Sequence, residues 1–451
     1  MTDQQISNSD SIARFICEGA TRAMPAQVVE MAQLCLADWV GVCTGARHES
    51  AAQIVRSVTR SWGGDGRSTL LLGGQASAPV AALCNGTLAH CLDFDDTYVS
   101  GNTHTSGPLW AATLALGEEL GAGESAMLAA FVTGFEAAAR VGYGLGEAVT
   151  ARGFHATGVF GRIAAAGAAA VLLRLDFAAT RNALGVAATQ VSGLVGSFGT
   201  MSKPFHAGKA AMDGILAAQL AASGFVGATD LFEPGGKLNR PIIQDGSALI
   251  QTADFSGWEI LNNSFKPYAA CHLTHPCIDA AMGIRLSPQD LPRVRAIRAK
   301  VGALAEQVTG RCSGPPETPL VGKFDLKYCV ALALHDYALS ASDFDRVVDD
   351  PAVHRTAAKV RVEVGDAYSF SSAAMSVEFD DGRILEIDVP VAKGHPGNPM
   401  TWDDMRTKFT ALVESTAGSS TEDVFACLRH FGDGSGKGIA VIRHLSEAIE
   451  V

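Results

Sequence analysis

Apolar residues recur at helical spacing through the first part of the chain. From about residue 10 to residue 260 they return every three or four positions, as on one face of an α-helix, and strand-like alternation is rare. The clearest segments are rich in alanine and leucine and span residues 111–120, 126–141, 160–173, 178–195 and 210–222. Glycine inside a helix costs about 1 kcal/mol relative to alanine, but small residues let neighbouring helices approach closely. The pattern therefore predicts a tight bundle of helices.

The pattern changes near residue 290. Polar residues alternate with apolar or β-branched residues over 294–301 and 360–364, which predicts strands. Residues 376–389 alternate in the same way on both sides of an Asp-Asp-Gly turn, as in a β-hairpin. Helical segments intervene near 325–340 and 342–350. This part of the chain is expected to form a smaller α+β domain.

The length of the chain predicts about two domains, because 451 residues are too many for one compact core. Helical spacing returns over 401–451, and this last part is expected to pack back on the bundle. We therefore predict a mainly α protein, with an all-α helical-bundle domain formed by 1–264 plus 396–451 and an α+β domain formed by 265–395.

Composition and charge narrow the class of protein. With 47% hydrophobic and 18% charged residues, the chain is typical of an ordered globular protein rather than a disordered or fibrous one. A formal net charge of −12 argues against nucleic acid and anionic membranes as partners. An anionic substrate would need a local basic region in this acidic protein.

The apolar and cysteine patterns favour a cytoplasmic protein. The longest apolar stretch, Ile163–Leu173, lies between Arg162 and Arg174 and is too short to cross a bilayer. The first ten residues are polar and lack the basic region and apolar run of a secretory signal. Ten cysteines occur without a C-x-x-C pair or a disulfide-like spacing, as expected for small buried residues in a reducing compartment.

The richest group of reactive residue types lies in the segment 90–98 and the loop that follows it. Asp93, Asp95 and Asp96 would repel one another unless hydrogen bonds or cations use their charges. His104 follows soon after, and one of these carboxylates can orient it as a general acid or base. The alternative is a helix C-terminus with solvated acids and a structural histidine.

Two further segments carry histidine and lysine. His155 precedes a predicted helix, where the dipole disfavours the imidazolium ion and free amides can receive an anion. A loop histidine without a role is the alternative. Lys203, His206 and Lys209 lie in a predicted Gly-rich loop that opens a helix, which suits the capture of carboxylates.

The α+β region adds Lys266 and Tyr328. Lys266 opens a segment that contains histidines and cysteines, and Tyr328 lies close to Lys323 and Lys327. A tyrosine beside lysines can donate a proton or bind an anion. Ordinary surface lysines are the alternative.

Metal and cofactor sites are not predicted. Cys271, His272, His275 and Cys277 invite a zinc site, but these ligands are crowded and lack a distant second pair. The spacing of an iron–sulfur site and the glycine fingerprints of nucleotide-binding loops are also missing from the sequence.

Taken together, these segments resemble the MmgE/PrpD family. The runs AHCLDFDDT with the later histidine, FHATGVFG, GTMSKPFHAGKAA, KPYAACHLTH and KFDLKYCVALAL occur in the order and at the spacings of that family. The resemblance covers nearly the whole chain. The family includes 2-methylcitrate dehydratases, cis-aconitate decarboxylases and an iminodisuccinate epimerase. It implies a large all-α domain with a smaller α+β lid, no cofactor or metal, and a homodimer.

The resemblance also implies roles for individual residues. His104 and His155 are the acid/base candidates, and Asp93 and Tyr328 join them as expected catalytic residues. Substrate-binding residues are expected at Thr97, Lys203, His206, Lys209, Lys266 and His275.

One chemical step unites the reactions of this family. Removal of a proton next to a carboxylate leaves an enolate-like dianion, which lysines and helix N-termini stabilise while a neutral histidine takes the proton. Loss of hydroxide then gives a dehydratase of the 2-methylcitrate or citrate type, which we expect first. A cis-aconitate-type decarboxylase and an epimerase of an aspartate-derived diacid are the alternatives. A ligand-binding or scaffold protein is the non-enzymatic alternative. The expected partner is a small polycarboxylate.

Overall fold

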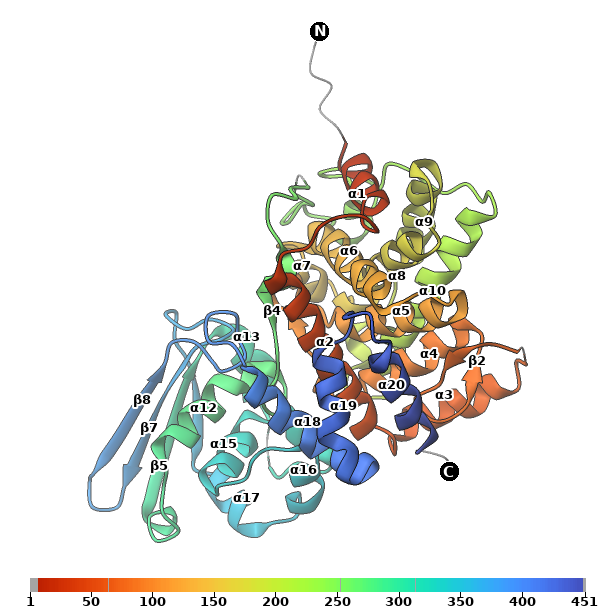
Figure 1. Cartoon of the computed structure of the whole chain (residues 1–451). Helices are drawn as coiled ribbons and strands as arrows, with labels where there is room; N and C mark the ends of the chain where they lie inside the picture. Colours follow the sequence, from red (N-terminus) through yellow and green to blue (C-terminus); the bar gives the residue numbers. More distant parts are fainter. Residues whose placement is uncertain (1–6, 64, 252, 313, 449–451) are drawn as a thin grey trace. The chain divides into compact units, whose positions relative to one another are not determined.

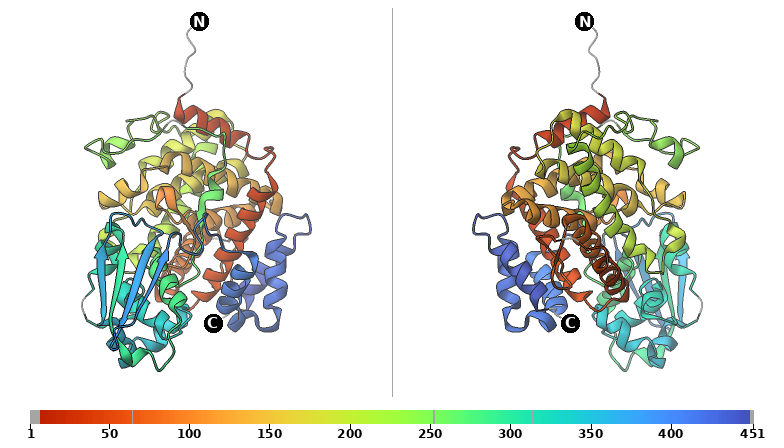
Figure 2. Two further views of the ribbon diagram at one scale, coloured as in Figure 1. Left: turned by 90° about the vertical axis from the view of Figure 1, so that its left-hand side faces the viewer. Right: turned by 90° about the vertical axis from the view of Figure 1, so that its right-hand side faces the viewer.

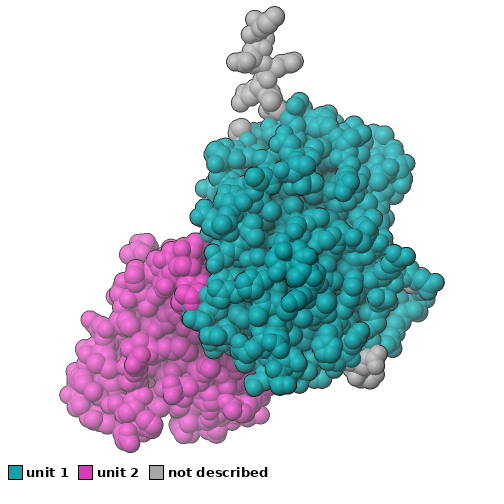
Figure 3. All heavy atoms as spheres, viewed as in Figure 1, with its two compact units in different colours: residues 1–264, 402–451 teal, residues 265–401 magenta. Residues whose placement is uncertain are grey.

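The computed structural model of this chain describes residues 7–63, 65–251, 253–312 and 314–448. The chain divides into two compact units, shown in different colours in Figure 3. Unit 1 comprises residues 1–264 and 402–451, and unit 2 comprises residues 265–401. Helices dominate the described residues, which confirms the prediction of a mainly α protein. The first six residues, part of the segment predicted not to be a secretory signal, lie outside the described ranges.

Unit 1 is a bundle of helices (Figures 1 and 2). Its helices are α1 (Asn8–Cys17), α2 (Ala26–Gly45), α3 (Ser50–Arg60), α4 (Ala78–Ala89), α5 (Ser106–Leu120), α6 (Glu124–Gly142), α7 (Gly146–Ala151), α8 (Ala156–Leu172), α9 (Phe177–Thr189), α10 (Ser202–Ala222), α11 (Asn239–Ile242), α18 (Trp402–Ala417), α19 (Thr421–Arg429) and α20 (Lys437–Glu447). Two antiparallel pairs of short strands complete the unit: β1 (Ser68–Thr69) with β2 (Gln75–Ala76), and β3 (Thr97–Tyr98) with β4 (Asn263–Ser264).

The centre of unit 1 is held together by close helix contacts at small residues. Helix α10 packs against α4 and α8, and α8 packs against α6. A Cβ at Gly208 of α10 would collide with the carbonyl oxygen of Leu83 on α4, and one at Gly214 would collide with Ala165 on α8. Only glycine allows these approaches. The tight packing predicted from the small residues is confirmed, and it fixes the direction of α10.

Several helix boundaries differ from the sequence-based prediction, among them the end of α9 and the start of α10. Helix α9 ends at Thr189, before the predicted end at 195, and the chain then turns through Gly193 with φ 109°. Helix α10 begins at Ser202, so the residues predicted to lie in a loop are helical instead. Pro204 occupies the first turn of α10, where proline is tolerated because that turn needs no intrahelical N–H donor.

The longest apolar helix is α2, not the segment 163–173 that the sequence analysis names. By length and composition alone, this helix is apolar enough to cross a membrane, whereas the sequence pattern pointed to 163–173 as the longest candidate. In the structure, 72% of its apolar window is buried. Its burial is that of a core helix.

Unit 2 combines a four-stranded sheet with short helices. Its strands are β5 (Val294–Val301), β6 (Val360–Val364), β7 (Ala373–Phe379) and β8 (Ile384–Val389), in the order β6-β5-β7-β8. Its helices are α12 (His275–Ile284), α13 (Ala303–Ala305), α14 (Pro319–Lys323), α15 (Leu326–Leu334), α16 (Ala341–Val347) and α17 (Pro351–Ala357).

The sheet of unit 2 follows the predicted pattern of strands. Strand β5 pairs parallel with β6 and antiparallel with β7, and β7 and β8 form the predicted hairpin. The alternation of buried and exposed residues in these strands explains why the sequence pattern located them. Helix α12 packs against β7 and β8 on one face, and the opposite face is left open (Figure 2).

Candidate active site

A compact turn after α4 carries three aspartates into the interior of unit 1. Asp93, Asp95 and Asp96 are 5%, 1% and 0% exposed. The backbone of Asp93 is left-handed, with φ 51°, a conformation that costs a residue with a Cβ about 1–2 kcal/mol. The segment does follow the C-terminus of α4, but its acids are buried, so the alternative of solvated acids is wrong. Buried charge and backbone strain at one turn are typical of a functional site.

His90, the C-terminal cap of α4, holds the turn through Asp95. Its Nδ1 lies 3.0 and 2.9 Å from the two carboxylate oxygens of Asp95. Burial lowers the pKa of His90 to about 4, with smaller contributions from Lys203 and His104, although the charge of Asp95 opposes the shift. A neutral His90 therefore donates its Nδ1 proton to the carboxylate. Within the described residues its Nε2 is buried and makes no hydrogen bond.

Asp95 stays ionised despite its burial. Burial by itself raises the pKa of Asp95, but His104 and His90 together lower that pKa well below its usual value. The carboxylate is thus a fixed negative charge between two imidazole rings, whose centroids are 4.6 Å apart.

His104 lies beside two carboxylates. Its Nδ1 is 3.4 Å from Asp95 Oδ1, and its Nε2 is 3.7 Å from Asp93 Oδ1. Its backbone N–H donates to Thr157 Oγ1 over 3.1 Å, which ties this loop to the first turn of α8. The His104 side chain is 14% exposed, whereas that of His90 is fully buried. Of these two rings, His104 is the one with access to a ligand.

Lys203 brings a positive charge to the same turn. It lies in the first turn of α10, and its Nζ donates to Asp93 Oδ1 over 2.6 Å. The same oxygen of Asp93 therefore lies between the ammonium group and His104. The Nζ of Lys203 is also 5.4 Å from the centre of the Phe198 ring. Lys203 is positioned by its own helix and by the strained turn together.

His155 caps the N-terminus of α8, as the sequence predicts. Its backbone N–H donates to the carbonyl of Gly193 over 2.9 Å, and its Nδ1 is 3.1 Å from Nδ1 of His206. One of these two rings must donate to the other. Burial lowers the pKa of His155 well below its usual value, and the charges of His90 and Lys203 add to the effect. His155 is therefore a neutral base candidate, 5.5 Å between ring centroids from His90.

A buried arginine supports this histidine pair. Arg162 Nε donates to Asp213 Oδ2 over 2.9 Å, Nη2 donates to Ser192 Oγ over 2.9 Å, and Nη1 donates to the carbonyl of Gly158. Lys209 pairs with the other carboxylate oxygen of Asp213. The structure therefore places Lys209, a predicted substrate-binding residue, in an ion pair with a residue of its own helix.

Asp96 and Thr97 lie on the inner side of the turn. Ser106 Oγ and, over 2.8 Å, Asn263 Nδ2 donate to Asp96 Oδ2. Burial and the charge of Asp38 raise the pKa of Asp96 to about 7, although these hydrogen bonds oppose the shift. Thr97 begins β3, and its buried Oγ1 has no hydrogen-bond partner among the described residues. That hydroxyl is available to a ligand.

Lys408, which lies near the C-terminal end of the chain, contacts the turn that carries the three aspartates. Its Nζ lies 2.5 Å from Asp38 Oδ1, donates to the carbonyl of Phe94 over 2.7 Å, and sits 3.9 Å from the centre of the Phe94 ring. The side chains of Lys408 and Asp38 are 3% and 1% exposed. Phe94 lies between two of the turn aspartates, so this buried ion pair holds their backbone.

The remaining predicted site residues belong to unit 2. Lys266 is 1% exposed, and His275 Nε2 donates to the carbonyl of Ala270 over 3.1 Å. Tyr328 lies on α15, and its buried hydroxyl has no hydrogen-bond partner within the described residues. Burial raises the pKa of Tyr328. Tyr328 and His354 line a cavity of about 440 Å³ in unit 2. The predicted roles of Lys266, His275 and Tyr328 stay predictions.

The fold assembles a set of metal-ligand side chains that the sequence spacing does not show. The ligand atoms of four of them lie within 4.8 Å of one another: His90, Asp93, Asp95 and His104. Two histidines and two aspartates are residue types that can bind a metal ion. The ammonium group of Lys203 lies 2.6 Å from Asp93 Oδ1, so it would compete with a metal ion for that oxygen. The crowded segment 271–277 contributes no such set in the described part of the chain.

Two residues that hold this site together have no role in the sequence-based prediction, namely His90 and Lys408. His90 lies within the AHCLDFDDT run, five positions before Asp95, and this spacing is the signal for its pairing with that aspartate. Lys408 has no such signal, because it lies in a helical segment more than 300 positions after Phe94. Its role follows only from the tertiary structure.

Known proteins match the chain over most of its length. The MmgE/PrpD N-terminal domain matches residues 10–245, and the MmgE/PrpD C-terminal domain matches residues 268–430. A cis-aconitate decarboxylase-like protein of Aspergillus oryzae is 27% identical over 90% of this chain and 91% of its own. Cis-aconitate decarboxylase of Aspergillus terreus is 26% identical over 92% and 90%, and that of Mus musculus is 27% identical over 73% and 71%. These relatives support a lyase, and the chain belongs to the MmgE/PrpD family.

Proposed function

We propose that this protein is a lyase that decarboxylates cis-aconitate or a closely similar unsaturated tricarboxylate. From the sequence we expect water elimination first, with decarboxylation as an alternative. The named activity of the relatives supports that alternative, because they match about 90% of the chain. The observation that carries the proposal is the cluster formed by His104, Asp93 and Lys203 beside a neutral His155.

The reaction breaks one C–C bond and consumes one proton. The bond between a CH2 group and its carboxylate breaks, and CO2 leaves. The electron pair of that bond forms a new double bond to the adjacent carbon. The pair of the original double bond takes a proton at the far carbon, which carries another carboxylate. The products are CO2 and a dicarboxylate with a terminal double bond, so the enzyme has to deliver one proton at a defined carbon.

We assign the proton delivery to His104. The pKa values of His90 and His155 are lowered mainly by burial, so both rings are neutral near pH 7 and are poor acids. His104 is more exposed than His90, and it has carboxylates of Asp93 and Asp95 near its two nitrogens. A positive charge on this ring would therefore have a partner on each side, and general acid catalysis requires such an oriented donor.

Binding a tricarboxylate needs more positive charge than the cluster itself supplies. Lys203 is the ammonium group of the cluster, and Asp93 already neutralises part of its charge at 2.6 Å. A substrate carboxylate can share this ammonium group, and the buried hydroxyl of Thr97 can donate a hydrogen bond. Further charge must come from residues outside the cluster, and Lys266 is the residue predicted for that role.

The test is an incubation in heavy water with cis-aconitate, citrate, 2-methylcitrate and aspartate-derived diacids, followed by NMR. The proposal expects loss of cis-aconitate, one CO2 per turnover, and a single deuterium at the carbon beside a carboxylate. Water loss from citrate or 2-methylcitrate without decarboxylation of cis-aconitate would identify a dehydratase instead. Binding of these acids with no turnover at all would support a ligand-binding protein.

A further inference from the structure

His90 lies against both of the histidines that the family resemblance makes acid/base candidates. Its ring centroid is 4.6 Å from that of His104 and 5.5 Å from that of His155, and the His155 ring is inclined to it by only 19°. His104 and His155 share no hydrogen bond and no ring contact among the described residues. The His90 side chain is 0% exposed, so any effect of His90 on the reaction has to pass through its neighbours.

The neighbour that links His90 to the reaction is Asp95. The Nδ1–H group of His90 donates to both carboxylate oxygens of Asp95, at 3.0 and 2.9 Å, which restricts the rotation of that carboxylate. On its other side, Asp95 Oδ1 lies 3.4 Å from Nδ1 of His104. The same oxygen therefore lies between a fixed donor and the candidate acid.

His90 restrains the carboxylate without neutralising it. Because burial lowers the pKa of His90 to about 4, the ring is neutral near pH 7 and donates a hydrogen bond without a positive charge. A lysine or arginine in its place would pair with Asp95 and leave less negative charge for His104. The Nε2 of His90 is buried and has no hydrogen-bond partner in the described part of the chain. An unpaired buried polar atom is destabilising, so packing alone does not account for a histidine here.

We propose that His90 is a positioning residue for proton delivery by His104, and that it acts through Asp95. The inference rests on the proposed function, in which His104 transfers one proton to a defined carbon of the substrate. Nδ1 of His104 is buried beside Asp95, which leaves Nε2 as the nitrogen for the substrate. The proton leaves Nε2 and forms the new C–H bond as CO2 departs. By holding Asp95, His90 fixes the direction in which this N–H group points.

The orientation of the acid affects the rate more than the binding of substrate. A general acid transfers its proton only when the N–H group is directed at the accepting atom, so a loosely held ring lowers kcat. The carboxylates of the substrate are bound by other groups, with Lys203 and Thr97 as the candidates in unit 1. Loss of the His90 donor should therefore change kcat and leave KM nearly unchanged.

Two substitutions at this position separate the donor from the volume of the ring. His90→Leu keeps a side chain of similar size without a donor, and it should lower kcat for cis-aconitate about 10- to 100-fold, the scale expected when an orienting partner is removed. Its KM should change by less than about threefold, because the lost interaction acts in the transition state. His90→Asn keeps an N–H donor bonded to Cγ, as Nδ1 is, and should recover kcat to within about fivefold of wild type.

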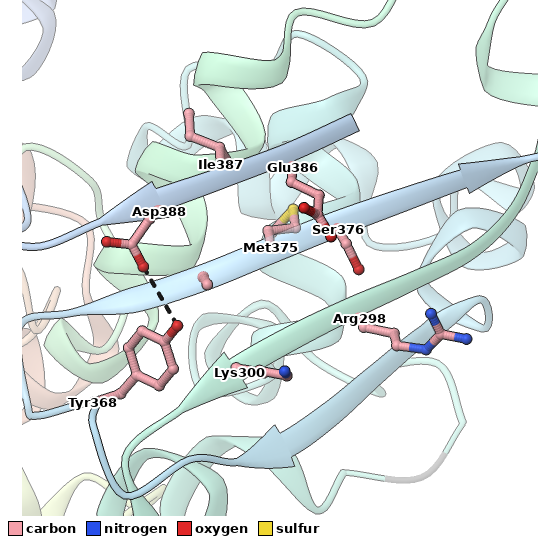
Figure 4. Close-up of a pocket in the computed structure, with 9 residues that line it drawn as sticks. Arg298, Lys300, Tyr368, Met375, Ser376, Glu386, Ile387 and Asp388 are labelled. Atoms are coloured by element: carbon pink, nitrogen blue, oxygen red, sulfur yellow. Dashed lines mark hydrogen bonds between the residues drawn. The ribbon is translucent and has the colours of Figure 1, made fainter. Parts of the chain in front are cut away.

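Two control variants distinguish this effect from the loss of a hydrogen bond elsewhere. Tyr368→Phe removes the hydroxyl that donates to the exposed carboxylate of Asp388 over 3.4 Å in unit 2 (Figure 4). It should change neither kcat nor the melting temperature. Asn85→Leu, on the same helix as His90, removes two buried hydrogen bonds with the backbone of Thr69 and Leu71. It should lower the melting temperature and leave the kcat of the folded protein unchanged.

The measurements are steady-state kinetics, thermal unfolding and calorimetric binding of tricarballylate, a saturated tricarboxylate without the double bond of cis-aconitate. Tricarballylate should bind His90→Leu about as tightly as wild type, which shows that the site is intact. His90→Ala removes the same donor without crowding the core and replaces the leucine variant if that variant does not fold.

Four results would overturn the proposal: wild-type kcat in the leucine and alanine variants, a raised KM at unchanged kcat, an asparagine variant as slow as the leucine variant, or failure of both donor-free variants to fold. The last result would make His90 a residue of the fold alone. A wild-type protein that does not convert cis-aconitate would refute the proposed function instead. The same variants would then be compared on the polycarboxylate that the wild type does convert.

Discussion

Replacing Lys408 with methionine tests whether a buried cation holds the aspartate turn of the candidate site. The ammonium group lies 2.5 Å from Asp38 and donates to the carbonyl of Phe94 over 2.7 Å, in a fully packed environment. Methionine keeps most of the side-chain volume but leaves a buried carboxylate and a carbonyl without their partner. Removal of one member of a buried ion pair costs about 3–5 kcal/mol. We expect the free energy of unfolding of unit 1 to fall by that amount at pH 8.

The cost should depend on pH in a defined direction. Burial already raises the pKa of Asp38, and Lys408 opposes that shift, so the variant raises this pKa further. At pH 5 a larger fraction of Asp38 then takes a proton, and the loss of stability should be smaller than at pH 8. The double variant D38N/K408M should recover part of the loss, because no buried charge remains.

Tryptophan fluorescence during urea unfolding is a suitable assay, because the five tryptophans all belong to unit 1: Trp39, Trp62, Trp110, Trp258 and Trp402. Arg406→Met is the matched control, since Arg406 lies on the same helix in an exposed ion pair with Asp403 and should cost less than about 1 kcal/mol. A loss below about 1 kcal/mol for Lys408→Met at pH 8, or a loss that does not change with pH, would refute the reasoning.

Three further predictions concern the cluster itself. His104→Ala should lower kcat by about two to four orders of magnitude, and Lys203→Met should raise KM and lower kcat together, whereas His444→Ala, at an exposed side chain on α20, serves as control. His104→Ala should melt near wild type, whereas Lys203→Met leaves the buried Asp93 carboxylate without its cation and should melt lower; an unfolded His104→Ala protein whose folded fraction stays active would mean a structural histidine. The folded state binds a proton at Asp96 up to about pH 7, whereas the unfolded chain releases it near the ordinary value of 3.8. The free energy of unfolding should therefore fall as pH rises from about 4 to 7, and Asp96→Asn should flatten this dependence; an unchanged slope would count against the assignment. Activity should survive prolonged chelation, and metal analysis should find less than one metal ion per chain; activity restored only by added metal would mean that the four ligand-type side chains hold an essential ion.

Periodicity predicted the elements of the fold well where burial alternates regularly. The strands at 294–301 and 360–364 have the predicted bounds, and buried and exposed residues alternate along most of the first of them. The start of α10 was predicted too late, because glycine and proline before residue 209 are typical of loops. Here the proline lies in the first helical turn, a position that sequence pattern alone does not distinguish from a loop.

The candidate site was predictable where its residues follow one another closely. His104 and Asp93 belong to one run of sequence, and Lys203 lies at the start of a helix that the family motifs identify. Contacts that join distant segments were not predictable. The pairing of Asp93 with Lys203 and the contacts of Lys408 depend on how the helices pack. Small residues such as Gly208 allow this packing, but their positions in the sequence do not reveal which helices meet.

Unit 1 is assembled from both ends of the chain, and this bears on the order in which the protein can fold. Unit 2, residues 265–401, is continuous and leaves the ribosome before α18 does. The turn that carries Asp93 and Asp95 lacks its buried cation until Lys408 has been synthesised. A nascent chain that stops at residue 400 would contain almost every candidate active-site residue, yet Asp38 would remain unpaired in its core. We therefore expect the active site to become competent only late in the synthesis of this chain.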